Sequence, residues 1–312
     1  MTKVDVCMAT YNHSTYVKDA VESIKKNAEH VPLQLWIVDD GSTDGTVDYL
    51  KSISEDFINV SYKSDNTGAG ATINEAMSKG SSEFVAIINS DDVWNPRKLE
   101  MQLQAYEKGY GDVIFTLAEY IDQNGEILKD GLGAYTPHTF RTNDDWTSKE
   151  WLQMVCFGGN CLCTPSVLGT RRAFMQIGGY DNRYRQIPDI ELWSRLFQTQ
   201  KPFVLPNKLV QFRLHPENTS KSTQDTNKRH AFEAKMIMKS VFLSMNKGIL
   251  AKYFGVSEEI NIPLFDQVVN IISKGRFYGM QLALELIHEN LENQKYESNI
   301  SAIDLHKISG GY

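Results

Sequence analysis

Apolar runs alternate with helix-period stretches over the first 120 residues of the chain. Five runs have the length and composition of buried β-strands, at residues 4–8, 35–38, 60–62, 84–88 and 113–115. Between them, apolar residues recur every three or four positions, as on the buried face of a helix, in the stretches 16–24, 47–53, 73–77 and 96–106. This alternation predicts an α/β fold in which a mostly parallel sheet is sandwiched by helices.

The pattern changes along the rest of the chain. Thr147 and Glu150 form a capping box that predicts the start of another helix. Beyond about residue 225 the apolar pattern is helical without strand runs. We therefore predict a first domain over residues 1–225 and a C-terminal helical region over residues 226–312. The apolar stripes of that region are most simply packing surface, and a homo-oligomer interface, another partner or peripheral membrane contact is the alternative.

Composition and charge narrow the class of partner. The 312-residue chain carries a formal net charge of −7 and no basic stripe, which argues against nucleic acid as a partner. Asp5 interrupts the first apolar run, and no stretch reaches the roughly 18 uncharged apolar residues of a membrane-spanning helix. The four cysteines are too few and too clustered for a disulfide framework. We expect a cytoplasmic protein without a transmembrane segment, at most in contact with the inner face of the membrane.

Three polar clusters directly follow predicted strands. They are Ala9-Thr10-Tyr11-Asn12, Asp39-Asp40-Gly41-Ser42 and Asn89-Ser90-Asp91-Asp92. Because the carboxyl ends of parallel strands meet at one edge of a sheet, we expect the three clusters to share a cleft. The pair Asp39 and Asp40 fits two roles: a turn that caps a helix, or acceptors for the N–H of a nucleotide base and the hydroxyls of a ribose.

The cluster at residues 89–92 concentrates two carboxylates and an amide at the end of an intensely apolar strand. Burial penalises bare charge there unless a positive group offsets it. Oxygen ligands suit Mg²⁺ or Mn²⁺, which take one or two protein carboxylates and complete their shell with phosphate oxygens and water. The cluster therefore predicts a divalent-metal site, and its alternative is a solvated cap for the helix that begins near Pro96.

In this order and at this spacing, the clusters resemble the family 2 inverting glycosyltransferases, whose GT-A fold is Rossmann-like. The resemblance covers roughly residues 3–223 and extends through Asn66-x-Gly68, Gly178-Gly179-Tyr180-Asp181, Asp189-Ile190-Glu191-Leu192-Trp193 and Arg213-x-His215. It implies a catalytic domain that moves a hexose or N-acetylhexosamine from a nucleoside-diphosphate sugar, by default a UDP-sugar. The implied acceptor is a hydroxyl of a glycan, lipid-linked or protein-linked molecule.

Carried over position by position, the resemblance implies a set of residues that contact the nucleotide sugar. They are Thr10, Tyr11, Asn12, Asp39, Asp40, Asn66, Gly68, Asn89, Ser90, Asp91 and Arg213. It also implies that Asp91 or Asp92 binds Mn²⁺ or Mg²⁺ between the two phosphates. His215, beside Arg213, is a further candidate for a metal or diphosphate contact, against the structural role that is usual for a lone histidine. The family's turn commonly begins with an acid, and Asn89 brings no charge. A nucleotide-sugar-binding or scaffolding protein without turnover is therefore the alternative.

Asp189 aligns with the catalytic base of that family. An acceptor hydroxyl is a poor nucleophile until a positioned carboxylate takes its proton, and backside attack then inverts the anomeric carbon. Asp189 also fits a simpler role as the cap of the helix that follows it. Glu191, Trp146 and Trp193 are candidate acceptor contacts, against a surface role for Glu191 and a core role for Trp193.

Other nucleotide-binding enzymes also alternate β and α elements. A dinucleotide-dependent oxidoreductase would carry G-x-G-x-x-G, but after Gly68 and Gly70 the third glycine is replaced by Ile73. The G-x4-G-K-[ST] loop of P-loop enzymes does not occur either. The sequence therefore favours a nucleotide sugar over a nicotinamide cofactor or a P-loop-bound ATP.

Overall fold

The chain folds into two compact units. The computed structural model describes residues 4–130, 139–140, 142, 146–158, 160–218, 223–244, 247–256, 264–273, 282–283 and 285–286. The first unit comprises Met1–Asp145, Cys161–Leu192 and Thr199–Lys221, and the second comprises Trp146–Asn160, Trp193–Gln198 and Ser222–Tyr312. The second unit thus includes two short segments that precede residue 225, and the domain boundary predicted there stays a prediction.

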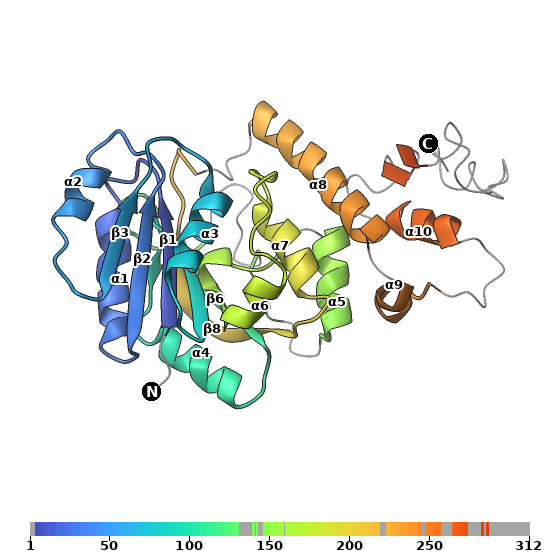
Figure 1. The fold of residues 1–312 in the computed structure, drawn as a ribbon, viewed down its shortest axis with the longest axis horizontal. Helices are drawn as coiled ribbons and strands as arrows, with labels where there is room; N and C mark the ends of the chain where they lie inside the picture. The colour runs from blue at the N-terminus through green and yellow to red at the C-terminus, as the bar shows by residue number, and fades with distance from the viewer. Residues whose placement is uncertain are drawn as a thin grey trace. The chain divides into compact units, whose positions relative to one another are not determined.

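One eight-stranded sheet lies at the centre of the first unit, in the order β3-β2-β1-β4-β7-β6-β8-β5 (Figure 1). Its strands are β1 (Val4–Thr10), β2 (Leu33–Asp39), β3 (Ile58–Tyr62), β4 (Phe84–Asn89), β5 (Val93–Trp94), β6 (Val113–Ile121), β7 (Leu168–Thr170) and β8 (Pro202–Arg213). The pairs β1–β2, β1–β4, β2–β3 and β6–β8 are parallel. The short strand β7 is antiparallel to β4 and β6, and β5 is antiparallel to β8. The predicted mostly parallel α/β sheet is confirmed.

Helices follow the strands as their apolar periodicity predicts. They are α1 (Val17–Ala28), α2 (Thr46–Lys51), α3 (Ala69–Lys79), α4 (Lys98–Glu107), the 3₁₀ turn Thr164–Ser166, α6 (Arg171–Gln176) and α7 (Pro188–Leu196). Val6 of β1 and Ile24 of α1 belong to one buried apolar cluster, while α3 packs against β1 and β2. Because successive side chains of a strand point to opposite faces, β1 contributes apolar residues to both sides of the sheet.

The strand register brings the three polar clusters to one edge of the sheet. Thr10 is paired with Asp39, and Ala9 is paired with Asn89. Further along the strand order, Ile121 at the end of β6 is paired with Arg213 at the end of β8. β1, β2 and β4 are parallel, and β6 and β8 run in the same direction because β7 is antiparallel to both β4 and β6. The carboxyl ends of these five strands therefore deliver the polar residues that follow them to the same edge of the sheet.

The second unit is helical in its described residues. It contains α5 (Ser148–Gln153), the π-helical turn Met154–Gly158, α8 (Gln224–Ser244), α9 (Lys247–Phe254) and α10 (Leu264–Ser273). The predicted capping box is confirmed: Thr147 accepts a hydrogen bond from the helix, and Glu150 accepts one from the backbone N–H of Thr147. Much of the predicted helical region 226–312 lies outside the described residues, including residues 287–312. None of the described helices is long and apolar enough to cross a bilayer.

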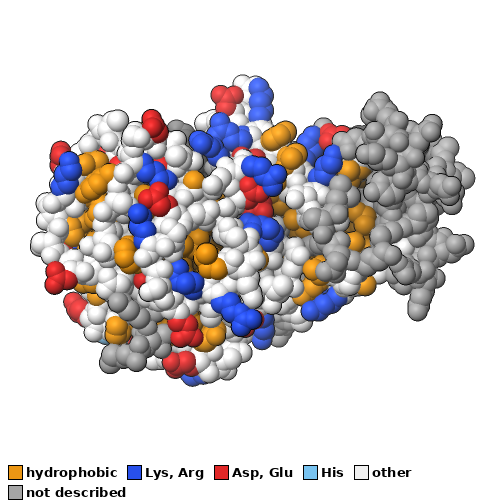
Figure 2. Space-filling view, in the orientation of Figure 1, with side chains coloured by type: hydrophobic (Ala, Val, Ile, Leu, Met, Phe, Trp, Pro, Cys, Tyr) orange, Lys and Arg blue, Asp and Glu red, His pale blue; other side chains and the backbone are white. Residues whose placement is uncertain are grey.

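Charged side chains are mixed on the face that Figure 2 draws. Lys and Arg side chains of the described residues are scattered there among Asp and Glu side chains. Such a distribution differs from the continuous basic stripe that nucleic-acid-binding proteins present.

Candidate functional site

Asp39 organises the turn that follows β2. Its carboxylate accepts hydrogen bonds from the backbone N–H of Ser42 at 2.9 Å and from the Ser42 hydroxyl at 2.5 Å. Ser42 Oγ in turn accepts the backbone N–H of Asn12 at 2.9 Å, and Asn12 Oδ1 accepts the N–H of Thr43 at 2.8 Å. Asn12 has a φ of 52°, a left-handed conformation that asparagine tolerates better than most residues. The ends of β1 and β2 are therefore tied together by side chains predicted to bind the nucleotide.

Asp40 fastens the segment that begins α3. Its carboxylate accepts the backbone N–H groups of Thr67 at 3.0 Å and Gly68 at 2.8 Å, and Lys63 Nζ lies 3.4 Å away. Burial opposes ionisation of Asp40, but the hydrogen bonds from Thr67 and Gly68 outweigh it and hold the pKa of Asp40 below its usual value. Asp40 thus stays charged and positions Gly68, while the neighbouring Asn66 is exposed.

Thr10 and Tyr11 differ sharply in their surroundings. Thr10 is 2% exposed, and among the described residues its hydroxyl has no hydrogen-bond partner. Tyr11 is 43% exposed. A buried hydroxyl without a partner is uncommon and is often found where a protein binds something else. Both residues sit at the end of β1, where the sequence predicts contact with a nucleotide.

The acidic turn at residues 89–92 separates its two carboxylates. Asp92 is 1% exposed and accepts hydrogen bonds from Asn89 Nδ2 at 2.9 Å and from the backbone N–H of Arg213 at 2.9 Å. Burial, together with the charge of Asp91, raises the pKa of Asp92 well above its usual value. Both oxygens of Asp92 therefore face protein donors, and Asp91 is the carboxylate of this turn that meets the histidines.

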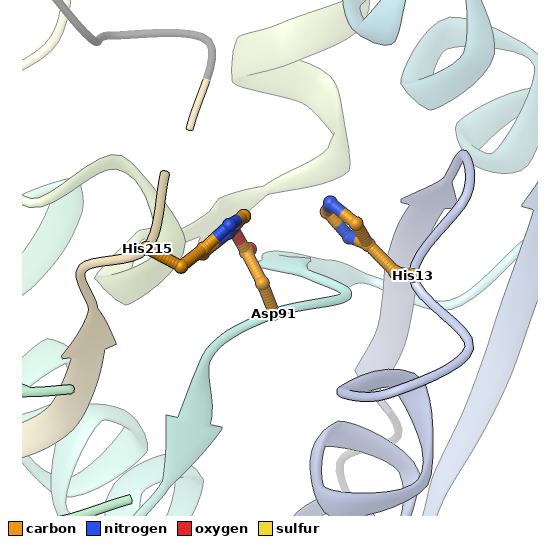
Figure 3. Close-up of side chains that lie close together, drawn as sticks. All are labelled: His13, Asp91 and His215. Atoms are coloured by element: carbon orange, nitrogen blue, oxygen red, sulfur yellow. The ribbon is translucent and has the colours of Figure 1, made fainter. Parts of the chain in front are cut away.

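Asp91 lies between two histidines from different parts of the chain (Figure 3). His215 Nε2 is 3.0 Å from Asp91 Oδ2, and the His13 and His215 rings are 5.7 Å apart. One ligand atom from each of the three residues lies within 4.8 Å of the others. Asn218 supports the group, because its amide donates to Asp91 Oδ2 at 3.3 Å and its carbonyl oxygen accepts the backbone N–H of His215.

His13 and His215 are held in different ways. His13 Nδ1 is 2.8 Å from the hydroxyl of Ser90. Ser90, which the sequence predicts to contact the nucleotide sugar, is thus hydrogen-bonded to a histidine in the structure. Burial lowers the pKa of His13, with an opposing contribution from the charge of Asp91. His215 is 7% exposed, and its Nδ1 has no hydrogen-bond partner among the described residues. Each ring therefore makes a hydrogen bond within the acidic turn, His13 to Ser90 and His215 to Asp91.

Arg213 holds the acidic turn through a hydrogen bond to its backbone. Its Nε donates to the backbone carbonyl of Asp91 at 2.8 Å, and its Nη2 pairs with Asp19 at 3.0 Å. The guanidinium also lies 5.1 Å from the centre of the Tyr16 ring. Its Nη1 donates to the backbone carbonyls of Asp122 at 3.3 Å and Gln123 at 3.4 Å, so all three nitrogens of the buried guanidinium have protein partners. In this arrangement Arg213 helps to position Asp91, and its predicted contact with the nucleotide sugar stays a prediction.

Asp189 lies in the first turn of α7. One carboxylate oxygen accepts the hydroxyl of Thr164 at 2.8 Å, and the other accepts the backbone N–H of Ile190 at 2.9 Å. Asp189 is thus the second residue of the helix rather than its cap, and its carboxylate lies in the first turn, at the positive end of the helix dipole. Glu191 is buried rather than on the surface, which corrects the alternative of a plain surface charge.

The two tryptophans predicted to contact an acceptor lie in the second unit. Trp193 is fully buried and stacks on Phe197 with ring centres 5.9 Å apart, as expected of a core residue. Trp146 is half-buried and packs edge-on against Trp151 at 4.8 Å. Of the two, Trp146 keeps the more accessible ring.

Some residues of the site do not stand out in the sequence. His13 directly follows the cluster at residues 9–12, Asn218 lies three residues after His215, and Thr164 is far from every predicted motif. For His13 a usable signal exists, because it directly follows the polar cluster at the end of β1. Its approach to Asp91 depends on the path of the turn after β1, which the order of residues does not reveal.

The first two-thirds of the chain match a known family. Residues 5–205 match the model described as Glycosyl transferase family 2. Among curated relatives, TuaG of Bacillus subtilis, a glycosyltransferase named for teichuronic acid biosynthesis, is 38% identical over 127 residues. This match covers 40% of the chain and 50% of TuaG, so the chain spans about half the length of that relative.

Solved structures share the fold at low sequence identity. TarS of S. aureus (residues 1–349) in complex with UDP superimposes with a TM-score of 0.61 and 15% identity, over 96% of this chain and 95% of that one. The mannosyltransferase PcManGT from Pyrobaculum calidifontis, in complex with GDP-Man and Mn²⁺, has a TM-score of 0.57 and 11% identity, over 94% of this chain and 81% of that one. These likenesses confirm the predicted GT-A-type fold.

Proposed function

The chain belongs to glycosyl transferase family 2, and from this premise we propose that it transfers a hexose or N-acetylhexosamine from a UDP-sugar with inversion at the anomeric carbon. The acceptor in this proposal is a hydroxyl of a glycan, a lipid-linked molecule or a glycoprotein. The observation that carries the proposal is the pairing of Asp91 with His215 at the sheet edge where the ends of β1 and β2 also lie.

Two residues at the end of β1 and the related solved structures support a UDP-sugar as the donor. Thr10 offers a buried hydroxyl with no partner among the described residues, and Tyr11 offers an exposed ring beside it. An aromatic ring and buried polar groups are what a nucleotide base needs for stacking and hydrogen bonding. TarS was solved with UDP and with UDP-GlcNAc, which favours UDP over GDP as the first nucleotide to test.

The donor set at Asp91 fits a divalent cation. A carboxylate oxygen and an imidazole nitrogen stand 3.0 Å apart, close to the separation of about 3.0 Å expected for adjacent ligands of an octahedral ion with bonds of about 2.1 Å. We assign Asp91 and His215 as the residues that hold Mn²⁺ or Mg²⁺, with Asp92 holding the turn rather than the ion. A bound cation would supply positive charge to the departing diphosphate.

Asp189 is the proposed general base. Its carboxylate would take the proton of the acceptor hydroxyl while the acceptor oxygen forms a bond to the anomeric carbon and the bond to the diphosphate breaks. The electron pair of the broken bond leaves with the nucleoside diphosphate. The hydroxyl of Thr164 and the N–H of Ile190 fix the direction of the carboxylate.

Asn89 is the residue that favours the alternative of a scaffolding protein without turnover, because it brings no charge to the acidic turn. In the structure the Asn89 amide donates a hydrogen bond to Asp92. The asparagine that stands in place of the family's usual acid therefore has a structural role in the turn that carries Asp91. TuaG and further relatives that match are named as glycosyltransferases. The enzyme is therefore the better supported of the two functions.

A donor panel tests the proposal. Purified protein is incubated with UDP- and GDP-sugars and Mn²⁺ or Mg²⁺, and release of nucleoside diphosphate is measured with and without EDTA. We expect metal-dependent release from at least one UDP-sugar. No release from any donor, with either metal, would count against an active enzyme.

The base is tested with the same assay. Asp189→Asn keeps the shape of the side chain but removes the proton acceptor, so transfer should fall by at least about a hundredfold. Binding of UDP, measured by calorimetry, should change little. Equal loss of transfer and binding would show that Asp189 is not the base.

A further inference from the structure

His13 occupies a position that the proposed metal site does not yet explain. It follows β1, whereas Asp91 follows β4 and His215 follows β8, so three separate strand ends bring the three side chains together (Figure 3). The backbone N–H of His13 donates to Thr46 Oγ1 at 2.9 Å, which anchors the turn that carries the ring. The imidazole is therefore presented by an anchored segment.

The contact with Ser90 orients the ring in the manner of a metal ligand. When His13 Nδ1 carries the proton, it donates to Ser90 Oγ at 2.8 Å and leaves the lone pair on Nε2. Histidines that bind metals nearly always donate their second N–H to an oxygen, which fixes both the tautomer and the direction of the ring. Ser90 belongs to the same turn as Asp91, so the bond also ties His13 to the carboxylate.

The three ligand atoms are close enough to share one ion. One nitrogen or oxygen atom from each residue lies within 4.8 Å of those of the other two, and His215 Nε2 is 3.0 Å from Asp91 Oδ2. Opposite ligands of an octahedral ion with bonds of about 2.1 Å are about 4.2 Å apart. A side-chain adjustment of a few tenths of an ångström at His13 would therefore bring all three atoms within bonding distance.

We propose that His13 is a third protein ligand of this cation, so that the site consists of two imidazoles and one carboxylate. The inference rests on the proposed function, because it concerns the ion assigned there to Asp91 and His215. Imidazole nitrogen is a poor ligand for Mg²⁺ and a better one along the series from Mn²⁺ to Zn²⁺. A site with two imidazoles should therefore discriminate against Mg²⁺ and in favour of Mn²⁺.

Metal titration tests this directly. Mn²⁺ alone and Mg²⁺ alone are titrated by calorimetry into the full chain, His13→Ala and His13→Gln. We expect Mn²⁺ affinity to fall by about tenfold or more in both variants, a loss typical of disrupted metal coordination, and Mg²⁺ affinity to change by less than about threefold. His30→Ala is the matched control, because His30 is an exposed histidine at the end of α1, and it should leave both affinities unchanged.

Pulsed electron paramagnetic resonance gives a measurement that needs no variant. Electron spin echo modulation of the Mn²⁺-loaded wild-type chain should show two coordinated nitrogens, and His13→Gln should show one. A single nitrogen in the wild type, or unchanged Mn²⁺ affinity in both His13 variants, would overturn the assignment of His13. These outcomes leave the proposed function intact if donor turnover persists, whereas a wild-type chain without metal binding and without turnover would remove the proposed function itself.

Discussion

The amide of Asn89 donates a hydrogen bond to Asp92, the more deeply buried carboxylate of the acidic turn. An aspartate at position 89 could not make this bond unless it were protonated, because an ionised carboxylate only accepts. It would also add a third carboxyl group to the turn that already holds Asp91 and Asp92. At this position an amide therefore holds the turn together, whereas a second acid would repel its neighbours.

Asn89→Asp should destabilise the fold by about 1–3 kcal/mol at neutral pH, because it removes a donor from a buried carboxyl group. The new carboxyl would have a raised pKa in the folded state, since the charge of Asp91 and the partial burial of the position oppose its ionisation. The folded state would then bind more protons than the unfolded state, so stability falls as pH rises. The loss relative to wild type should thus be larger at pH 8 than at pH 5, as measured by urea unfolding.

Asn59→Asp is a matched control for this variant. Asn59 on the edge strand β3 also donates its amide to one side-chain oxygen, that of Gln34, at 3.1 Å. The partner is neutral, so the control should show a smaller loss and little dependence on pH. Equal losses and equal pH profiles for the two variants would argue against the proposed role of Asn89.

At the scale of elements, the sequence predicts the helices and strands that are long enough to show an apolar period, and it does not predict the shortest strands. The first four strands and the helices α1 to α4 carry enough periodic apolar residues to be recognised. The strands β5 and β7 have two and three residues, too few to show a period, and they form only because longer strands lie beside them. The sequence predicts that the polar clusters lie at one edge, because the ends of parallel strands gather there. It does not predict the separate roles of Asp91 and Asp92, because these depend on the direction in which each side chain points.

The start of α3 depends on one glycine. Gly68 has a φ of 94° and gives its N–H to Asp40, so Gly68→Ala should cost about 1–2 kcal/mol from backbone strain. A Cβ there would meet Arg185 at 3.7 Å, an ordinary contact, so the cost should come from the backbone rather than from a clash. We also expect weaker UDP binding, because the segment fastened by Asp40 would shift. Thermal unfolding and calorimetry with UDP measure the two effects.

Gly109→Ala separates backbone strain from a role in binding. Gly109 follows α4 with a φ of 72°, and a Cβ there would meet nothing within 4 Å. This variant should lose a similar amount of stability while UDP affinity stays at the wild-type level. If both variants bind UDP as tightly as wild type, the segment at Gly68 takes no part in nucleotide binding.

At the scale of the whole molecule, the two units are interleaved along the chain. The second unit takes α5 and the turn after it from before residue 160, and α8 and α9 from beyond residue 222. Within this unit Phe157 stacks on Phe242 at 5.5 Å, and Gln153 donates to the backbone carbonyl of Tyr253 at 2.9 Å. These contacts join segments about 85 to 100 residues apart, and the apolar pattern of each segment does not reveal its partner.

A fragment ending at residue 225 should therefore be less stable than the full chain. It would keep α5 and Phe157 but lose their partners in α8 and α9, leaving buried apolar side chains exposed. We expect a lower unfolding temperature and increased binding of the dye ANS, whereas a fragment ending at residue 256 retains both helices and should lie closer to the full chain. Identical unfolding temperatures for the shorter fragment and the full chain would show that residues 1–225 fold on their own, as the sequence boundary alone would suggest.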